Sequence, residues 1–308
     1  MTDPVFKLSE LLDRFNLEND GAVRVLYGEP MSRHTSFRIG GPASLFLIPK
    51  NEETLCSVCS MAKEAGIRVF LLGNGSNVLF DDGGFDGAVI STSALHAITV
   101  ESDRIRAEAG ASLGALSVAA RENGLTGLEF SYGIPGTVGG AVLMNAGAYG
   151  GEIKDVLESS ASVDCGGADH RTLTASEHAF GYRDSVYRHE NRVILSAVFR
   201  LQKGEKEEIA AKMNDFMGRR VSKQPLEYPS AGSVFKRPEG HFVGQMVEES
   251  GLKGYGIGGA QVSEKHAGFI INRGGATSAD VLALVEHIRS VILKNYGCEL
   301  QCEIIHVK

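Results

Sequence analysis

The chain has 308 residues, of which 43% are hydrophobic and 22% charged, a composition typical of globular proteins and sufficient for two or three domains. Its 31 Lys and Arg and 38 Asp and Glu give a formal charge of −7 without any basic block, which argues against a nucleic-acid partner. The first 21 residues alternate charged and apolar side chains and so indicate neither a secretory signal nor a membrane-spanning helix. We therefore expect a cytoplasmic protein that does not insert into membranes.

Apolar patterning in the first half of the chain predicts mixed helices and strands. A strand over 43–48, a helix over 52–65 and a strand over 68–72 form a β-α-β unit that runs directly into a glycine-containing loop. Further strands are predicted at 87–91, 98–100 and 105–109, and a helix over 113–123 ends before Gly124, whose position suits a C-terminal cap.

The second half continues this mixture. An apolar strand over 193–201 precedes a charged amphipathic helix over 205–221, which we expect to link two domains. After it, the pattern predicts helices at 244–250 and 278–296 and strands at 267–272 and 300–307. The expected domains are 1–85, 86–204 and 205–308.

The five cysteines, an odd number, fit a reduced compartment better than a disulfide framework. Cys56 and Cys59 form a Cys-x-x-Cys pair, but they lie in the predicted helix over 52–65 and no second pair follows at metal-ligand spacing. We therefore expect all five to be structural, and no metal site.

Two glycine-rich segments are candidates for binding phosphate groups. Gly73-Asn-Gly-Ser-Asn77 follows a predicted strand, and Gly133-Ile-Pro-Gly-Thr-Val-Gly-Gly140 opens a stretch with too much glycine for an ordinary helix or strand interior. Glycine lets a phosphate approach backbone N–H groups closely. Neither segment has the lysine of a P-loop or the Rossmann spacing, so neither a nucleotide triphosphatase nor a Rossmann dehydrogenase is supported. A plain β-turn and a turn-rich surface are the alternatives.

Six motifs in this order resemble one known family, the UDP-N-acetylenolpyruvoylglucosamine reductases (MurB). They are Arg38-Ile-Gly-Gly41, Gly73-Asn-Gly-Ser-Asn77, Gly133-Ile-Pro-Gly136 with Gly139-Gly140, Tyr182-Arg-Asp-Ser185, Gly232-Ser-Val-Phe-Lys236 and a late Glu303. The resemblance covers residues 33–307.

This resemblance implies an α+β fold in which a two-subdomain FAD-binding fold of the vanillyl-alcohol-oxidase type precedes a smaller α+β substrate domain. It implies non-covalent FAD and NADPH as co-substrate. NADPH reduces FAD, and reduced FAD passes hydride to the enol ether of UDP-N-acetylglucosamine enolpyruvate, which gives UDP-N-acetylmuramate for peptidoglycan synthesis. A small-molecule substrate is thus the expected partner.

Three residues match the family's catalytic positions. Hydride addition leaves electron density on the substrate's α-carbon and carboxylate, so a cation and a proton donor are needed there. The resemblance gives Arg183 the task of gripping the carboxylate, Ser233 that of protonating the carbon, and Glu303 that of donating a hydrogen bond from a buried carboxyl. By pattern alone, Arg183 also suits a surface salt bridge, and Ser233 also suits a turn. Glu303 also suits the solvent-exposed face of a strand, together with Glu299 and Gln301.

The resemblance also supplies binding residues. The expected cofactor-binding residues are Arg38, Gly73, Asn74, Gly75, Ser76, Asn77, Gly133, Ile134, Pro135, Gly136, Thr137, Gly139, Gly140, Asn145 and Gly147. The expected substrate-binding residues are Tyr182, Lys223, Lys236, Gln261 and Asn272. Gln261 and Asn272 equally suit loop positions. Basic residues at the end of the linker helix and near Lys236 supply positive charge for the UDP pyrophosphate.

Some positions depart from the family pattern. Arg237 replaces a frequent Asn, and Cys302 a frequent proline, while the short third domain resembles the compact subclass. Two rival functions are an FAD oxidase of the same superfamily and a silent flavin-binding module. Pro42 after Gly40-Gly41 argues against the histidine through which such oxidases attach flavin, and the joint presence of Arg183, Ser233 and Glu303 argues against a silent module.

Overall fold

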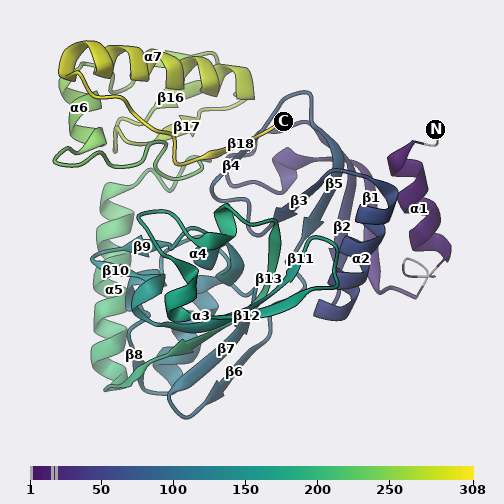
Figure 1. Cartoon of the computed structure of the whole chain (residues 1–308). Coiled ribbons are helices and arrows are strands. Elements are labelled where there is room, and N and C mark those ends of the chain that lie inside the picture. Colours follow the sequence, from purple (N-terminus) through teal and green to yellow (C-terminus); the bar gives the residue numbers. More distant parts are fainter. Residues whose placement is uncertain (1–2, 15–16, 18–19) are drawn as a thin grey trace. The chain divides into compact units, whose positions relative to one another are not determined.

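A computed structural model describes residues 3–14, 17 and 20–308 (Figure 1). The chain separates into two compact units. The first comprises residues 1–27, 44–74 and 87–219, and the second comprises residues 28–43, 75–86 and 220–308. Each is described below by itself.

The first unit contains most of a four-stranded sheet and two helices. The strands follow the order β1 (Val23–Pro30), β2 (Pro42–Pro49), β5 (Phe85–Ser91) and β3 (Val69–Leu72), and the helices are α1 (Pro4–Arg14) and α2 (Glu52–Ala65). Helix α2 begins where the Asn51 side chain accepts a hydrogen bond from the Thr54 N–H at 2.8 Å, and it ends at Gly66, whose φ is +72°. Its apolar face is buried in a core with β2, β5 and α1.

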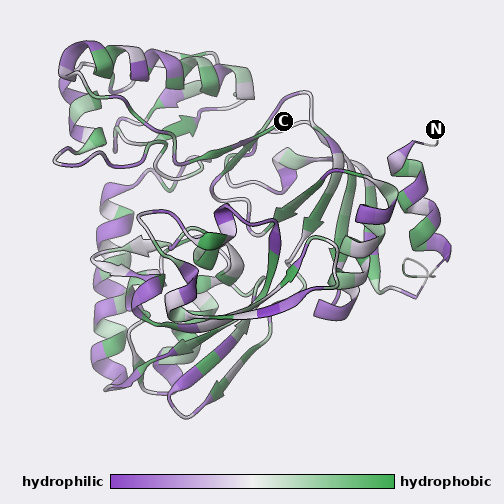
Figure 2. Cartoon of the chain, viewed as in Figure 1, coloured by the Kyte–Doolittle hydropathy of each residue, from purple (hydrophilic) through white to green (hydrophobic). Residues whose placement is uncertain are grey.

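The same unit contains a five-stranded antiparallel sheet. Its strands follow the order β12 (His170–Thr174), β11 (Leu157–Asp164), β13 (Arg192–Arg200), β7 (Arg104–Glu108) and β6 (Ile98–Glu101). Helices α3 (Leu113–Glu122) and α4 (Val138–Leu143) contribute to the core beside this sheet. The longer α5 (Lys206–Lys223) buries Ile209 and Met213 and alternates hydrophobic with hydrophilic residues (Figure 2).

The second unit has its own core around α6 (Val243–Glu249) and α7 (Ser278–Tyr296). An antiparallel sheet has the order β15 (Gly256–Ile257), β16 (Ala260–Val262) and β17 (Ile270–Asn272), and β18 (Ile305–Val307) pairs in parallel with β4 (Val78–Phe80). Thus the last residues of the chain are joined to the strand that follows the first glycine loop.

Short elements complete the fold. They are the strands β8 (Leu125–Thr126), β9 (Gly147–Ala148), β10 (Gly151–Glu152) and β14 (Gln202–Lys203) and the 3-10 helices η1 (Met31–Arg33), η2 (Glu129–Ser131), η3 (Ile153–Asp155), η4 (Ala175–His178) and η5 (Val186–Arg188).

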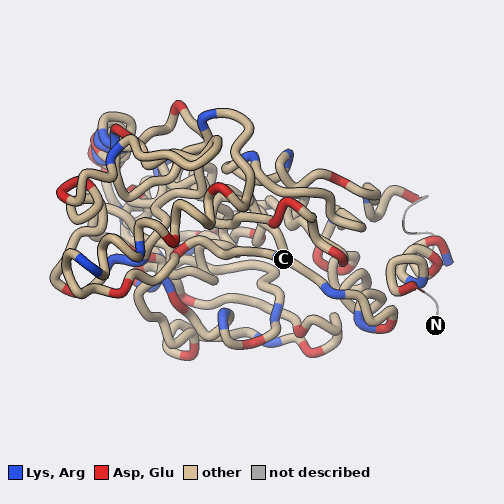
Figure 3. The backbone as a smooth tube through the Cα atoms, turned by 90° about the horizontal axis from the view of Figure 1, so that it is seen from above, with Lys and Arg blue, Asp and Glu red and all other residues tan. Residues whose placement is uncertain are grey.

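The charged residues are mixed in sign (Figure 3), and the five cysteines, all within the described residues, form no disulfide. Acidic and basic residues are interspersed along the tube in Figure 3. Each of the five cysteines is a free thiol. Over the described part of the chain, no helix is long and apolar enough to cross a membrane, and no group of His, Cys, Asp and Glu could hold a metal ion.

Several predicted elements need correction. The patterning overlooked α1, β1, β11 and β12, of which β11 and β12 are rich in polar residues. In the β-α-β unit, β5 lies between β2 and β3. The predicted strand over 300–307 is restricted to β18, because the preceding residues pair only through isolated bridges. The glycine-rich stretch also contains a helix, α4, which the high glycine content had argued against.

Candidate active site

The loop from Gly73 to Asn77 joins β3 to β4 and has an unusual set of backbone donors. Within the described chain, none of its five N–H groups donates a hydrogen bond to the protein. Gly75 has φ +60°, and a Cβ there would lie 2.2 Å from the His34 carbonyl oxygen, so only glycine fits. The loop therefore presents successive unpaired N–H dipoles, an arrangement suited to an anion.

The second glycine segment uses its backbone differently. The N–H groups of Val138 and Gly139 donate to the carbonyls of Ala111 and Ala109, both at 2.8 Å, so they serve the fold. By contrast, a Cβ at Gly136 would meet no protein atom nearer than 3.8 Å, and one at Gly140 none nearer than 3.5 Å. Neither φ is left-handed, so neither conformation nor protein packing requires glycine at these two positions. The protein alone therefore does not explain the glycines at these two positions.

The two segments meet. Asn74 Nδ2 donates to the Pro135 carbonyl at 3.2 Å, and a Cβ on Gly73 would lie 2.4 Å from Thr137 Oγ1. Thr137 itself caps α4 by accepting from the Gly140 N–H at 3.4 Å. Thus the structure brings together residues that sequence analysis assigned to one cofactor site from segments about sixty positions apart.

Arg183 lies at the tip of a tight hairpin. Gly181 and Asp184 pair across it, Tyr182 and Arg183 form its turn, and Arg183 adopts φ +55°, a left-handed conformation unusual for a bulky residue. The guanidinium donates from Nη2 to the Gly147 carbonyl at 3.0 Å and lies 5.0 Å from the centre of the Tyr182 ring. Tyr182 is 47% exposed.

Ser233 and Glu303 are brought together in the second unit. The Glu303 N–H donates to the Val234 carbonyl at 2.8 Å, and Ser233, the residue before Val234, is exposed and forms a bridge with Phe269. Glu303 is half-buried and lies outside any strand, in contrast to the predicted apolar strand. The first glycine loop contacts Glu303 and Ile305, because Asn77 Nδ2 donates to the Glu303 carbonyl at 3.2 Å and the Asn77 carbonyl accepts from the Ile305 N–H at 2.9 Å.

Positive charge gathers in the second unit around His266. Burial is the main reason that the pKa of this histidine is lowered, and the nearby charges of Lys223 and Lys253 lower it further. Lys223 is exposed and Lys236 half-buried. Gln261 donates to the Gly254 carbonyl at 2.9 Å but leaves its buried Oε1 unpaired. An unpaired buried acceptor of this kind is costly unless a ligand or water supplies the missing donor.

Gln224 shares this property, with a buried Oε1 that no protein donor satisfies. Sequence analysis missed this residue. The one feature of the sequence that could have pointed to Gln224 is its position beside Lys223, at the end of α5.

Some expected ligands direct their side chains to the protein. Asn145 Nδ2 donates to the Gly181 carbonyl at 2.9 Å, and its Oδ1 accepts from the Lys154 N–H at 3.0 Å. Asn272 donates to the Phe37 carbonyl at 3.2 Å and accepts from the N–H groups of Gly274 and Ala276. Both side chains therefore fix loop geometry. Of the remaining expected cofactor ligands, Arg38 is exposed at φ +55°, Ser76 and Ile134 are half-buried, and Gly133 and Gly147 lie in turns or short strands.

Comparisons with known proteins identify the family. Residues 224–307 match the model of the UDP-N-acetylenolpyruvoylglucosamine reductase C-terminal domain, and residues 43–172 match an FAD binding domain. A reductase of that name from Clostridium perfringens is 46% identical over 96% of this chain and 95% of its own length. The chain belongs to the UDP-N-acetylenolpyruvoylglucosamine reductase family. A relative from Geobacillus thermodenitrificans is 48% identical over 92% of this chain and 93% of its own.

A solved member of this reductase family has the same fold. The MurB structure from Thermus caldophilus aligns with a TM-score of 0.79 and 32% identity, and the alignment covers 93% of this chain and 99% of that one. The expected α+β class, with an FAD-binding domain followed by a smaller reductase domain, is thus confirmed. The chain is an FAD-dependent oxidoreductase that uses NADPH as co-substrate.

The residues present fit FAD. The unpaired N–H groups of Gly73 to Asn77 suit a pyrophosphate, and the glycines at 136 and 140, which protein packing does not require, suit a ligand that lies against the backbone. Both observations come from the backbone geometry of this chain, so they support FAD binding in addition to the family match.

Proposed function

We propose that this reductase acts on UDP-N-acetylglucosamine enolpyruvate and that Arg183, Ser233 and Glu303 carry the reaction. As a member of its family, the chain takes part in peptidoglycan precursor synthesis with a small-molecule substrate. One observation carries the proposal: Asn77 of the amide-rich loop bonds to the Glu303 carbonyl and to the Ile305 N–H, and the Glu303 N–H bonds to the carbonyl of Val234, the residue after Ser233. Asn77, the proposed acid and the proposed proton donor are thereby linked through the backbone of the second unit.

We propose that FAD is held non-covalently by the backbone of residues 73–77 and by the segment from Gly133 to Gly140, with Arg38 and Gly147 as further contacts. Asn145 would support this site through loop geometry. When bound, FAD supplies the hydride that the enolpyruvyl group accepts. The three expected domains remain our proposal for how the chain divides these tasks.

Arg183 is suited to the substrate carboxylate. Its guanidinium keeps its charge, and its planar fork matches two carboxylate oxygens. Hydride addition to the terminal carbon shifts electron density to the α-carbon and carboxylate, so a fixed cation stabilises the transition state more than the ground state. The bond from Nη2 to the Gly147 carbonyl and the Tyr182 ring support this fixed orientation.

Ser233 is proposed to deliver the proton to the α-carbon. An unperturbed hydroxyl is a weak acid, so a neighbour must stabilise the developing alkoxide or return a proton to it. Glu303 is the proposed partner for the substrate's enolate-like group, and the exposure of Ser233 leaves its hydroxyl accessible. With Glu303 holding the enolate-like group, Ser233 would protonate the α-carbon from one face only.

Residues around the second unit's cationic region would bind the UDP group. Lys223 and Lys236 would attract its pyrophosphate, and the unpaired Oε1 of Gln261 would accept from a donor such as a ring N–H or sugar hydroxyl. Tyr182 would pack on the substrate beside Arg183, whereas Asn272 would act by holding its loop. The free thiols favour a reducing compartment, and we infer a cytoplasmic location.

The substitution Ser233→Ala tests the assignment. We expect NADPH to reduce the flavin at a nearly unchanged rate, while reoxidation by UDP-N-acetylglucosamine enolpyruvate slows by about a hundredfold or more. Stopped-flow absorbance of the flavin separates the two half-reactions. Ser230→Ala, three residues earlier, is a matched control because its carbonyl, which the substitution keeps, accepts from the Ser36 hydroxyl at 2.7 Å, and its own hydroxyl bonds to none of the described residues. Equal slowing of both half-reactions by Ser233→Ala would remove the proton-donor role.

A further inference from the structure

A buried side-chain network connects the two ends of the hairpin that carries Arg183. His178 precedes the hairpin and Tyr187 follows it, and both contact Ser160 of β11. Ser160 Oγ lies 2.7 Å from His178 Nε2 and 2.7 Å from the Tyr187 hydroxyl oxygen. The three residues are 1%, 0% and 3% exposed, in the order Ser160, His178, Tyr187. None of them belongs to the sequence motifs of the family resemblance.

The hydrogen-bond partners fix the direction of this network. His178 Nδ1 lies 2.8 Å from the Thr174 carbonyl oxygen, which can only accept, so Nδ1 carries the proton. Nε2 of the neutral ring must then accept from the Ser160 hydroxyl. The Ser160 oxygen in turn accepts from the Tyr187 hydroxyl. Burial lowers the pKa of His178, which agrees with a neutral ring.

The segment closed by this network is strained and therefore needs support. Ala179 has φ +47° and Arg183 has φ +55°, so two non-glycine residues of a short stretch adopt left-handed conformations. Such conformations cost free energy and persist when the surroundings determine them. The supports are specific: Ser185 Oγ donates to the Leu143 carbonyl at 2.7 Å, and Arg188 Nη1 donates to the Arg183 carbonyl at 2.8 Å.

We infer that Tyr187, Ser160 and His178 form a positioning network that holds Arg183 ready for the substrate carboxylate. The inference rests on the proposed role of Arg183. The network ties residues 178 and 187 to one atom of a sheet strand, so the hairpin between them has a fixed base. Loss of the Ser160 hydroxyl releases both ends, and loss of the Tyr187 hydroxyl releases one. The guanidinium then samples more orientations, and transition-state stabilisation falls although Arg183 is still present.

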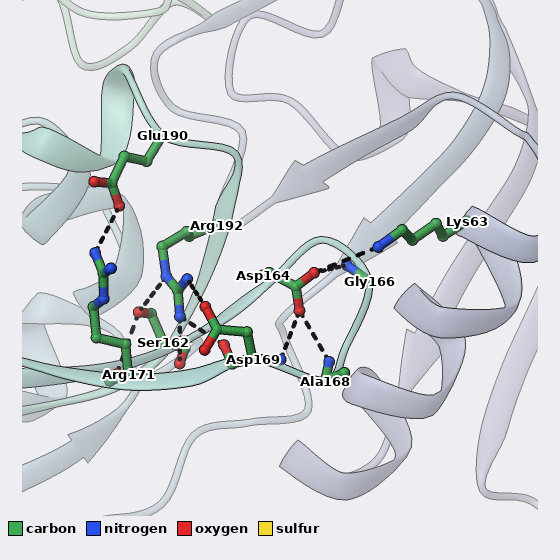
Figure 4. Close-up of polar contacts among 9 residues, drawn as sticks. All are labelled: Lys63, Ser162, Asp164, Gly166, Ala168, Asp169, Arg171, Glu190 and Arg192. Atoms are coloured by element: carbon green, nitrogen blue, oxygen red, sulfur yellow. Dashed lines mark hydrogen bonds and ion pairs between the residues drawn. The ribbon is translucent and has the colours of Figure 1, made fainter.

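The matched variants are Ser160→Ala, Tyr187→Phe and the control Ser162→Ala. Ser162 lies two residues further along β11 and is also 1% exposed, but its hydroxyl accepts from Arg192 Nε at 3.1 Å, away from the hairpin (Figure 4). We expect flavin reduction by NADPH to stay within about twofold of the parent in all three variants. Flavin reoxidation by the enolpyruvyl substrate should slow by about tenfold or more in Ser160→Ala and Tyr187→Phe only. Tyr187→Phe retains the ring and provides the test if Ser160→Ala does not fold.

Two further measurements distinguish positioning from general damage. In Arg183→Ala protein, adding Ser160→Ala should slow reoxidation no further, because the network acts through Arg183. Amide hydrogen exchange of the holoenzyme should accelerate at residues 179–186 in Ser160→Ala and remain unchanged there in Ser162→Ala. Additive slowing, unchanged exchange or equal slowing of both half-reactions would overturn the inference.

The outcomes also separate this inference from the proposed function. If Arg183→Ala leaves reoxidation unchanged, the proposed role of Arg183 fails, and the inference that depends on it fails too. If Arg183→Ala slows reoxidation while Ser160→Ala and Tyr187→Phe do not, the inference alone fails.

Discussion

Asp164 stabilises the turn between β11 and β12 through three backbone contacts. Its carboxylate accepts hydrogen bonds from the N–H groups of Asp169 and Ala168 at 2.9 Å and of Gly166 at 3.0 Å (Figure 4). These bonds, foremost those from Asp169 and Ala168, lower the pKa of Asp164 to about 2. The ion pair with Lys63 at 3.7 Å adds little, because that lysine is largely exposed.

The lowered pKa of Asp164 predicts a pH dependence of stability. The unfolded carboxyl, with an ordinary value of 3.8, binds protons more readily than the folded one, so the contribution is complete above pH 3.8 and is lost as pH falls toward about 2. Asp164→Asn should therefore lower the free energy of unfolding at pH 7 and lower it less near pH 3. Urea unfolding of both proteins at each pH measures this. A difference that is constant across the two pH values would contradict it.

At the residue scale, the motifs located tight backbone positions but could not orient side chains. Glycine is required by the close approach of other protein atoms at 73 and 75, whereas the cofactor contacts assigned to 136 and 140 stay predictions. The side chains of Asn145 and Asn272 could not be oriented from sequence, since their partners depend on loops brought together by folding. The network of Ser160, His178 and Tyr187 has no local pattern at all.

At the scale of elements, α7 shows how a local signal fixes a boundary. Thr277 accepts from the Asp280 N–H at 3.0 Å, Asp280 accepts from the Thr277 N–H at 3.0 Å, and Gly297 ends the helix with φ +63°. The predicted range of 278–296 is confirmed, because capping box and terminal glycine are both readable in the sequence. By contrast, β12 is a mostly exposed strand of polar residues, so its position depends on pairing with β11.

The cap of α7 can be tested by substitution. Thr277→Ala removes the acceptor for the Asp280 N–H and should lower the free energy of unfolding by about 1 kcal/mol. Thr277→Ser keeps a hydroxyl and should retain most of it. Chemical denaturation of the three proteins at one pH gives the comparison. If the serine variant loses as much stability as the alanine variant, the hydroxyl does not act as the cap.

At the scale of the whole molecule, FAD binding should be visible as stability. A ligand that binds only folded protein adds about 2.7 kcal/mol when present at a hundred times its Kd. We expect the thermal midpoint of the apoprotein to rise with FAD concentration. Gly136→Ala should reduce this rise with little change to the apoprotein, because the added methyl makes only ordinary contacts with Ile134 and Leu113 at 3.8 Å, whereas the cofactor is proposed to lie against this backbone.

A second glycine provides the control for that experiment. Gly218 lies in α5 with nothing within 4 Å of its missing Cβ, so Gly218→Ala should leave the FAD-dependent rise intact. If both variants keep the full rise, Gly136 does not adjoin the cofactor.

The division of the whole chain into three domains stays a prediction. A helix over 205–221 was foreseen because amphipathic patterning marks α5, and the matches to an FAD binding domain and a reductase C-terminal domain lie on either side of it. Contact between residues far apart in sequence was not accessible. The parallel pairing of β18 with β4 joins residues 305–307 to 78–80, and the sequence of neither three-residue strand indicates which strand it pairs with.

The bare amides of the loop from Gly73 to Asn77 bear on how this enzyme tolerates mutation. Every amino acid except proline carries the same main-chain donor, so many exchanges at Ser76 would leave the proposed grip on phosphate intact. Gly75 has no such latitude, since any added carbon collides with main chain. Mutations in this loop would then affect cofactor binding mainly through changes of backbone conformation, and much less through changes of side-chain chemistry.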